Sequence, residues 1–155
     1  KALKKILSEI VSAVQYLHHK HIAHLDLKPE NILIKDGRPL ICDFGFSNFH
    51  LVRRFDFVKH GTPIFAGPES YSAAPVKVDA FKVDIYALGL IFYLCATQDS
   101  TLYSNNSYWT YRRINYGLEF DESDELQKLA KECTAHDPKY RPTIDEILSH
   151  SYFNF

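Results

Sequence analysis

The chain has 155 residues, with 18 lysines and arginines against 19 aspartates and glutamates, and a formal net charge of -1. Hydrophobic residues make up 46% and charged residues 24% of it, which is ordinary globular usage and argues against a disordered chain. The near balance of charge predicts no nucleic-acid partner, the longest apolar run (residues 85–96) is too short for a membrane span, and the length suits one domain.

The cysteine and methionine contents bear on the cellular location of the protein and on whether the chain is a fragment. Its three cysteines, at positions 42, 95 and 133, are odd in number and far apart. This pattern favours free thiols over a disulfide framework, so we expect an intracellular location, cytoplasmic or nuclear. The sequence has no methionine and opens inside a helical pattern, so we expect it to be a fragment of a longer chain.

The first predicted elements are a helix and a hairpin. Apolar residues recur with helical spacing over residues 3–17 and would form one stripe along the helix. Two short apolar runs follow, at residues 32–34 and 39–42, with Asp36 and Gly37 between them. An Asp-Gly pair between such runs predicts a β-hairpin.

The middle of the chain divides into an irregular segment and a buried helix. Residues 44–76 keep no helical or strand period, and long irregular segments of compact domains are usually functional. Residues 83–96 are apolar on nearly every side apart from Asp84, which predicts a helix in the centre of the core.

The last third is predicted to be helical after a polar loop at residues 98–107. A short helix is expected at residues 109–114, and an amphipathic stripe over residues 126–133 predicts another. Thr143 and Glu146 have the spacing of a capping box, which predicts a final helix. The expected fold class is therefore mainly α with one small β-hairpin.

The residues that carry chemistry gather around the predicted hairpin. Residues 24–31 read His-Leu-Asp-Leu-Lys-Pro-Glu-Asn, and residues 43–45, after the hairpin, read Asp-Phe-Gly. Phosphoryl transfer from a nucleotide needs such groups. It requires oxygen ligands for Mg²⁺, a cation near the migrating charge, and a carboxylate that orients the attacking hydroxyl.

These two segments resemble the catalytic loop and the magnesium-binding motif of eukaryotic protein kinases. The run Lys-Pro-Glu at residues 28–30 resembles the serine/threonine form of that loop. The resemblance implies ATP and Mg²⁺ as cofactors. Carried over residue by residue, it implies a catalytic base at Asp26, a γ-phosphate contact at Lys28, Mg²⁺ ligands at Asn31 and Asp43, and further nucleotide contacts at Glu30 and at Leu33, beneath the adenine.

Further matches follow in the family's order. Residues 61–63 and 68–69 resemble the segment that receives the substrate hydroxyl, and Thr62 would bond toward Asp26 and Lys28. The resemblance also implies structural support from His24 packed on Phe44, from Gly45, from Asp84 accepting catalytic-loop amides, and from Glu69 paired with Arg141.

The resemblance runs from residue 1 to about residue 153, and it covers only the larger, helical C-terminal lobe of a kinase domain. It divides the chain into a catalytic loop (24–31), an activation segment (43–69) and a helical subdomain (78–155). The family's glycine-rich loop, strand lysine and helix glutamate have no counterpart in the sequence. We therefore expect the N-terminal lobe to be absent and the fragment alone to be inactive.

Each signal has a simpler explanation when it stands alone. Asp26 and Asp43 could be turn residues, and Glu69 and Arg141 could be solvated charges. The histidines at positions 18, 19, 21 and 24 suggest a zinc site, but no second His or Cys pair completes one. The joint, ordered placement of the motifs favours the kinase interpretation.

One departure from the family concerns regulation. Leu25 stands where most kinases have an arginine that meets a phosphorylated hydroxyl, and residues 48–61 contain no Ser, Thr or Tyr. We therefore expect an activation segment that needs no phosphorylation. It would be held instead by packing of Phe49, Leu51, Phe55 and Phe57.

The sequence thus predicts that the parent protein is a serine/threonine kinase that acts on protein or peptide substrates. The alternative is a pseudokinase or scaffold that uses this lobe as a protein-binding module. The presence of every residue that this lobe would contribute to the chemistry favours the enzyme. Residues 46–48 and the ending at residues 150–153 resemble the calmodulin-dependent and AMP-activated kinase group.

Overall fold

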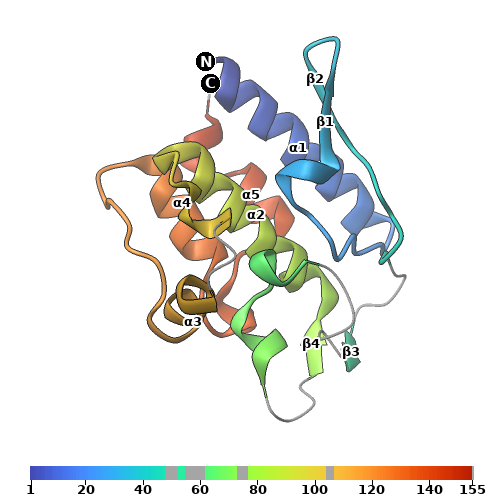
Figure 1. Cartoon of the computed structure of the whole chain (residues 1–155). Helices are drawn as coiled ribbons and strands as arrows, with labels where there is room; N and C mark the ends of the chain where they lie inside the picture. The colour runs from blue at the N-terminus through green and yellow to red at the C-terminus, as the bar shows by residue number, and fades with distance from the viewer. Residues whose placement is uncertain (48–51, 55–61, 73–76, 104–106, 155) are drawn as a thin grey trace.

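The computed structural model of the chain describes residues 1–47, 52–54, 62–72, 77–103 and 107–154. Within these ranges it is mainly helical, with two small antiparallel sheets of two strands each (Figure 1). The helices are α1 (Ala2–His19), α2 (Ala80–Thr97), α3 (Ser107–Tyr116), α4 (Glu125–Cys133) and α5 (Ile144–Leu148). The strands are β1 (Ile32–Lys35), β2 (Arg38–Ile41), β3 (Val52–Arg54) and β4 (Lys77–Asp79).

Helix α2 forms the centre of the core, as its apolar sequence predicts. Leu88, Leu90 and Phe92 on it are fully buried, and it packs closely against α4 (Figure 1). A Cβ at Gly89 would lie 2.7 Å from the Cβ of Cys133, so glycine is what allows the two helices to approach this closely.

The full 18 residues of α2 are long and apolar enough to cross a bilayer by length and composition alone. The uninterrupted apolar run is residues 85–96, as the sequence indicates, and the first turns of the helix add Lys82 and Asp84. In the structure 67% of the helix is buried within the protein, and it carries the charged side chain of Asp84. Its hydrophobicity is therefore accounted for by its place in the core.

The predicted first helix and hairpin are confirmed. Helix α1 buries its stripe against α5 and β2, although Leu3 at its start stays 41% exposed. Strands β1 and β2 pair in register from Ile32 opposite Ile41 to Lys35 opposite Arg38. Asp36 and Gly37 between them have φ values of 50° and 75°, the left-handed conformation that a two-residue turn of type I′ requires.

The C-terminal third also follows the prediction closely. Helix α3 contains the expected residues 109–114, and a 3-10 turn (Ser100–Tyr103) occupies part of the expected loop before it. Thr143 and Glu146 cap α5 reciprocally, with each side chain bonded to the other residue's backbone N–H.

Sheet β3–β4 is the element that the sequence did not predict. Val52–Arg54 lies inside the segment expected to be irregular and pairs antiparallel with Lys77–Asp79. Strands of three residues are too short to show a period of two, so no local pattern indicates them.

The three cysteines are free thiols, as predicted. Cys133, the last residue of α4, is fully buried against α2, and burial raises the pKa of its thiol far above the ordinary value. Burial also raises the pKa of Cys95. Since the thiolate is the reactive form, these two thiols are poor nucleophiles in the folded protein.

Candidate active site

Asp84 of α2 holds the loop at residues 24–31 from within the core. Its carboxylate is 1% exposed and accepts hydrogen bonds from the backbone amides of His24 and Leu25, each at 2.8 Å. A buried carboxylate is costly unless hydrogen-bonded, and these amides compensate for its burial. Leu25 adopts φ 68°, a left-handed conformation uncommon for a bulky residue, while its amide is bonded to Asp84.

His18 is a member of this site that sequence reasoning missed. Its Nε2 lies 2.9 Å from Asp84 Oδ2, and its ring stacks on Phe81 with centroids 4.3 Å apart. Its place among the four histidines at positions 18, 19, 21 and 24 suggested only a zinc ligand. Its position four residues after the buried Val14 on α1 is the signal that it faces the core.

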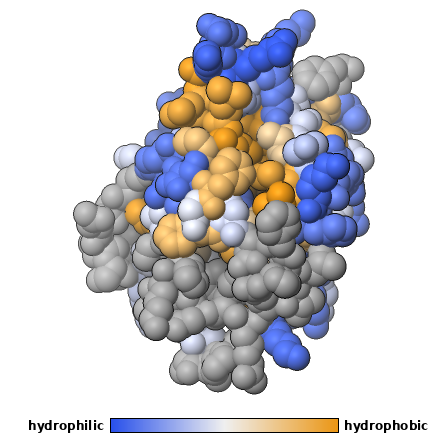
Figure 2. Space-filling model, turned by 90° about the vertical axis from the view of Figure 1, so that its right-hand side faces the viewer, coloured by the Kyte–Doolittle hydropathy of each residue, from blue (hydrophilic) through white to orange (hydrophobic). Residues whose placement is uncertain are grey.

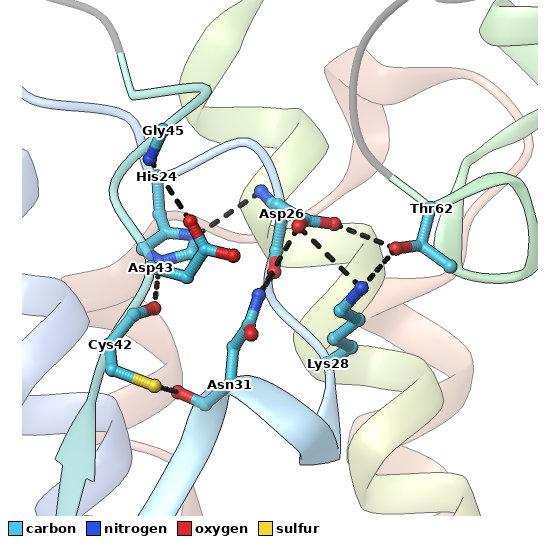
Figure 3. A network of polar contacts seen from close by, with 8 residues as sticks. All are labelled: His24, Asp26, Lys28, Asn31, Cys42, Asp43, Gly45 and Thr62. Carbon is cyan, nitrogen blue, oxygen red and sulfur yellow. Dashed lines mark hydrogen bonds and ion pairs between the residues drawn. The ribbon is translucent and has the colours of Figure 1, made fainter.

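Asp26 lies at the centre of a group of polar side chains (Figure 3). Thr62 Oγ1 donates to Asp26 Oδ1 at 2.9 Å, and Lys28 Nζ donates to the same hydroxyl at 2.6 Å. Asn31 Nδ2 donates to the backbone oxygen of Asp26 at 2.8 Å and to its Oδ2 at 3.2 Å. The carboxylate is only 6% exposed and is oriented from both sides by donors.

His24 links this loop to the end of the hairpin. The backbone N–H of Asp26 donates to His24 Nδ1 at 3.1 Å, so Nε2 carries the ring proton and donates to the Cys42 carbonyl at 3.0 Å. The backbone N–H of Cys42 in turn donates to the Asn31 carbonyl at 2.9 Å. Asp43, the next residue, is thereby held close to the loop.

The segment after Cys42 turns sharply at Asp43, whose φ is 60°. In Figure 3 the carboxylates of Asp26 and Asp43 lie on either side of the Asn31 amide. Phe44 packs edge-to-face on His24 with ring centroids 5.0 Å apart, and the Gly45 N–H donates to Asp43 Oδ1 at 3.3 Å.

The oxygen atoms of Asn31 and Asp43 fit a magnesium ion by their chemistry. The Asn31 amide nitrogen points toward Asp26, so its oxygen is the atom left for a cation, and the Asp43 carboxylate is exposed. In the part of the chain that the structure describes, no three His, Cys, Asp or Glu side chains form a metal-binding group. Mg²⁺ does not require one, because waters and substrate phosphates complete its shell.

Two of the predicted site residues lie apart from this group. Glu30 is exposed in the 3-10 turn Pro29–Asn31, and Leu33 on β1 is 53% exposed. Both side chains face solvent in the 155-residue chain.

Glu69 and Arg141 form a buried ion pair, so the interpretation as two solvated charges is wrong. Their side chains are 3% and 0% exposed, and two parallel N–H···O contacts of 2.7 Å join them. Arg141 Nε also donates to the Ala135 carbonyl at 2.9 Å, and Nη1 to that of Lys82 at 2.9 Å. The pair fixes the end of the segment that begins at Thr62.

Changing Arg141 to Lys is expected to lower the free energy of unfolding by about 1–3 kcal/mol, because an ammonium group keeps the charge but cannot replace both contacts to Glu69 and the carbonyl contacts. Urea unfolding of the complete protein that contains this chain measures the loss. The control is Arg38→Lys on the exposed hairpin, and equal losses in the two variants would contradict the assignment of a buried pair.

Leu25 occupies an apolar site. It is 7% exposed and packs in a cluster with Ala23, Val78, Ala80 and Val83. The four side chains expected to hold the activation segment, Phe49, Leu51, Phe55 and Phe57, lie outside the described residues. Independence from phosphorylation therefore stays a prediction.

A buried carboxylate, an adjacent lysine and two nearby side-chain oxygens on a mainly helical lobe are groups of the kind that phosphoryl transfer requires. Residues 1–153 match the protein kinase domain family, and the chain belongs to it.

Three relatives illustrate the match. The chain is 34% identical over 97% of its length to the striated muscle preferentially expressed protein kinase of Danio rerio. It is 28% identical over 98% to CBL-interacting protein kinase 5 of Oryza sativa subsp. japonica. It is 36% identical over 92% to protein R436 of Acanthamoeba polyphaga mimivirus, whose name places it among serine/threonine-protein kinases. The chain spans 5%, 34% and 53% of these relatives' lengths.

Proposed function

We propose that the complete protein containing this chain transfers the γ-phosphoryl group of ATP to serine and threonine hydroxyls of protein substrates. The observation that carries the proposal is the hydrogen-bonded group of Asp26, Lys28, Asn31 and Thr62. A carboxylate, a cation and an amide converge there beside the segment that ends at the Glu69–Arg141 pair.

In this proposal Asp26 orients the acceptor hydroxyl and accepts its proton. Thr62 holds Oδ1 of Asp26 from the substrate side, and Lys28 places its positive charge 3.7 Å from Oδ2, next to where the phosphoryl group would pass. Asn31 and Asp43 would hold Mg²⁺, which supplies electrostatic stabilisation of the phosphate charge when bound.

The exposed apolar surface around the hairpin is evidence for a second structural unit that packs there and completes the nucleotide site. Leu33, Ile34 and Leu40 on the hairpin, with Phe44 and Phe46 after it, are 38–56% exposed. Figure 2 shows this side of the molecule, where apolar side chains gather in the upper part. An apolar area of this kind on a folded protein indicates an interaction surface. We assign it to the N-terminal kinase lobe, which would bring Leu33 against the adenine.

Serine/threonine specificity is supported by the run Lys-Pro-Glu at residues 28–30 and by the name of the mimivirus relative. The intracellular location belongs to the same proposal and is supported by the free thiols.

The test is phosphotransfer from labelled ATP with Mg²⁺ to a peptide library offering Ser, Thr or Tyr. The complete protein is expected to label Ser and Thr peptides. The 155-residue chain alone is expected to fall short by at least about 10³-fold, because phosphoryl transfer depends mostly on positioning and half of the nucleotide site is then missing. The pseudokinase alternative predicts that the complete protein labels none of the peptides. Labelling of Tyr peptides alone would overturn the proposed specificity.

A further inference from the structure

Arg113 of α3 is a buried cation that no motif predicts. It is 4% exposed and donates three hydrogen bonds to uncharged oxygens. Nη2 reaches the Ile64 carbonyl at 2.9 Å, and Nη1 reaches the Ala66 carbonyl at 3.1 Å and the Tyr86 hydroxyl at 2.5 Å. Among the ion pairs that the described residues form, none joins a carboxylate to Arg113.

Burying a guanidinium without a carboxylate is costly, and the group cannot lose its proton to avoid that cost. Three oxygen acceptors compensate in part. Two of them belong to the backbone of one short segment, residues 64–66. The Arg113 side chain thus joins α3 to the backbone of that segment. These contacts do not depend on the side chains of Ile64 and Ala66.

The segment that Arg113 holds leads directly to Asp26. Phe65, between the two bonded carbonyls, is 5% exposed, and its N–H donates to the Thr62 carbonyl at 3.0 Å. Thr62 Oγ1 then donates to Asp26 Oδ1. The 3-10 turn Pro63–Phe65, which contains Ile64, therefore connects the Arg113 contacts to Thr62 and, through Thr62, to the proposed catalytic base.

A second buried arginine holds the other end of the same segment. Arg141 binds Glu69, and both guanidinium groups face the ring of Tyr86, Arg141 at 4.6 Å and Arg113 at 5.5 Å from its centroid. Burial raises the pKa of Tyr86, although the two arginines act in the opposite direction, so its hydroxyl stays neutral. The segment is fixed at Ile64 and Ala66 by α3, and at Glu69 by Arg141.

We propose that Arg113 is a positioning residue for the protein substrate: by holding the backbone of residues 64–66, it keeps Thr62 and the acceptor hydroxyl in place at Asp26. This inference rests on the proposed function and adds a residue of α3 to the site. Lysine is not equivalent, because a single ammonium lacks the planar fork that reaches two carbonyls and a hydroxyl together.

The experiment compares the complete protein with its Arg113→Gln and Arg113→Lys variants and with Arg112→Gln, a change at the exposed neighbouring residue on α3. Four quantities are measured: kcat and KM for a Ser/Thr peptide, KM for ATP, and the rate of ATP hydrolysis without peptide. Hydrolysis by water uses the nucleotide site but not the positioned acceptor. Both Arg113 variants are expected to lose about tenfold or more in kcat/KM for the peptide, while the two ATP quantities change by less than about twofold.

A purely structural role would reduce peptide phosphorylation and ATP hydrolysis in the same proportion, and that result would overturn the proposal. Equal effects of the Arg112 and Arg113 changes would overturn it as well. Arg113→Lys, the milder change, serves if the glutamine variant does not fold.

Hydrogen exchange separates this proposal from the proposed function. Arg113→Gln is expected to speed amide exchange over residues 62–67 and to leave the β1–β2 hairpin unchanged. If the wild-type protein transfers no phosphate, the proposed function fails, and unchanged exchange over residues 62–67 would show that Arg113 does not hold the segment.

Discussion

Asp26→Asn in the complete protein is expected to lower the rate of phosphoryl transfer by about 10²–10⁴-fold, the usual contribution of a general base. Asparagine has the same shape, and its amide oxygen can still accept the bond from Thr62 Oγ1, which lies 2.9 Å from Oδ1. What it loses is the ability to take a proton. ATP affinity should therefore change little, and the measurements are kcat for a peptide and the Kd of ATP.

Asp36→Asn is the matched control. Asp36 is an exposed carboxylate at the hairpin turn with φ 50°, a conformation that asparagine tolerates. The control should keep wild-type activity. A loss below about tenfold in Asp26→Asn would remove Asp26 from the role of base.

Asp84→Ala is expected to lower the free energy of unfolding by about 3–5 kcal/mol. The substitution leaves two backbone amides and His18 Nε2 without their acceptor in the core, and unsatisfied buried donors are expensive. Urea unfolding of the complete protein measures the change.

The control for Asp84→Ala is Asp145→Ala on α5. Asp145 also contacts a histidine, His19 at 2.9 Å, but both side chains are more than half exposed. An exposed pair contributes little, so this variant should lie within about 1 kcal/mol of wild type. Similar losses in the two variants would mean that the buried amide contacts do not stabilise the loop at residues 24–31.

Only part of the candidate site could be predicted from sequence. The loop at residues 24–31 and Asp43 could be assigned to the site because the types of their side chains, their order and their spacing together indicate phosphoryl transfer. The two arginines differ in this respect. Arg141 follows from resemblance alone, and Arg113 has no sequence signal, because a single arginine on an amphipathic helix normally faces water. Its burial depends on α3 lying against residues 64–66, which no local pattern encodes.

The sequence by itself determined those helices and turns that depend on residues close together in the chain. The apolar stripe of α1, the Asp36-Gly37 turn and the Thr143 cap each depend on residues a few positions apart. They could therefore be predicted from the sequence. The tertiary structure alone decided which of these elements meet. His18 and Asp84 are 66 residues apart, Arg113 and Ala66 are 47 apart, and strands β3 and β4 are too short to have a pattern of their own. Contacts of this kind form because the packing of α1, α2 and α3 brings distant groups together in a medium where each buried polar atom must find a partner.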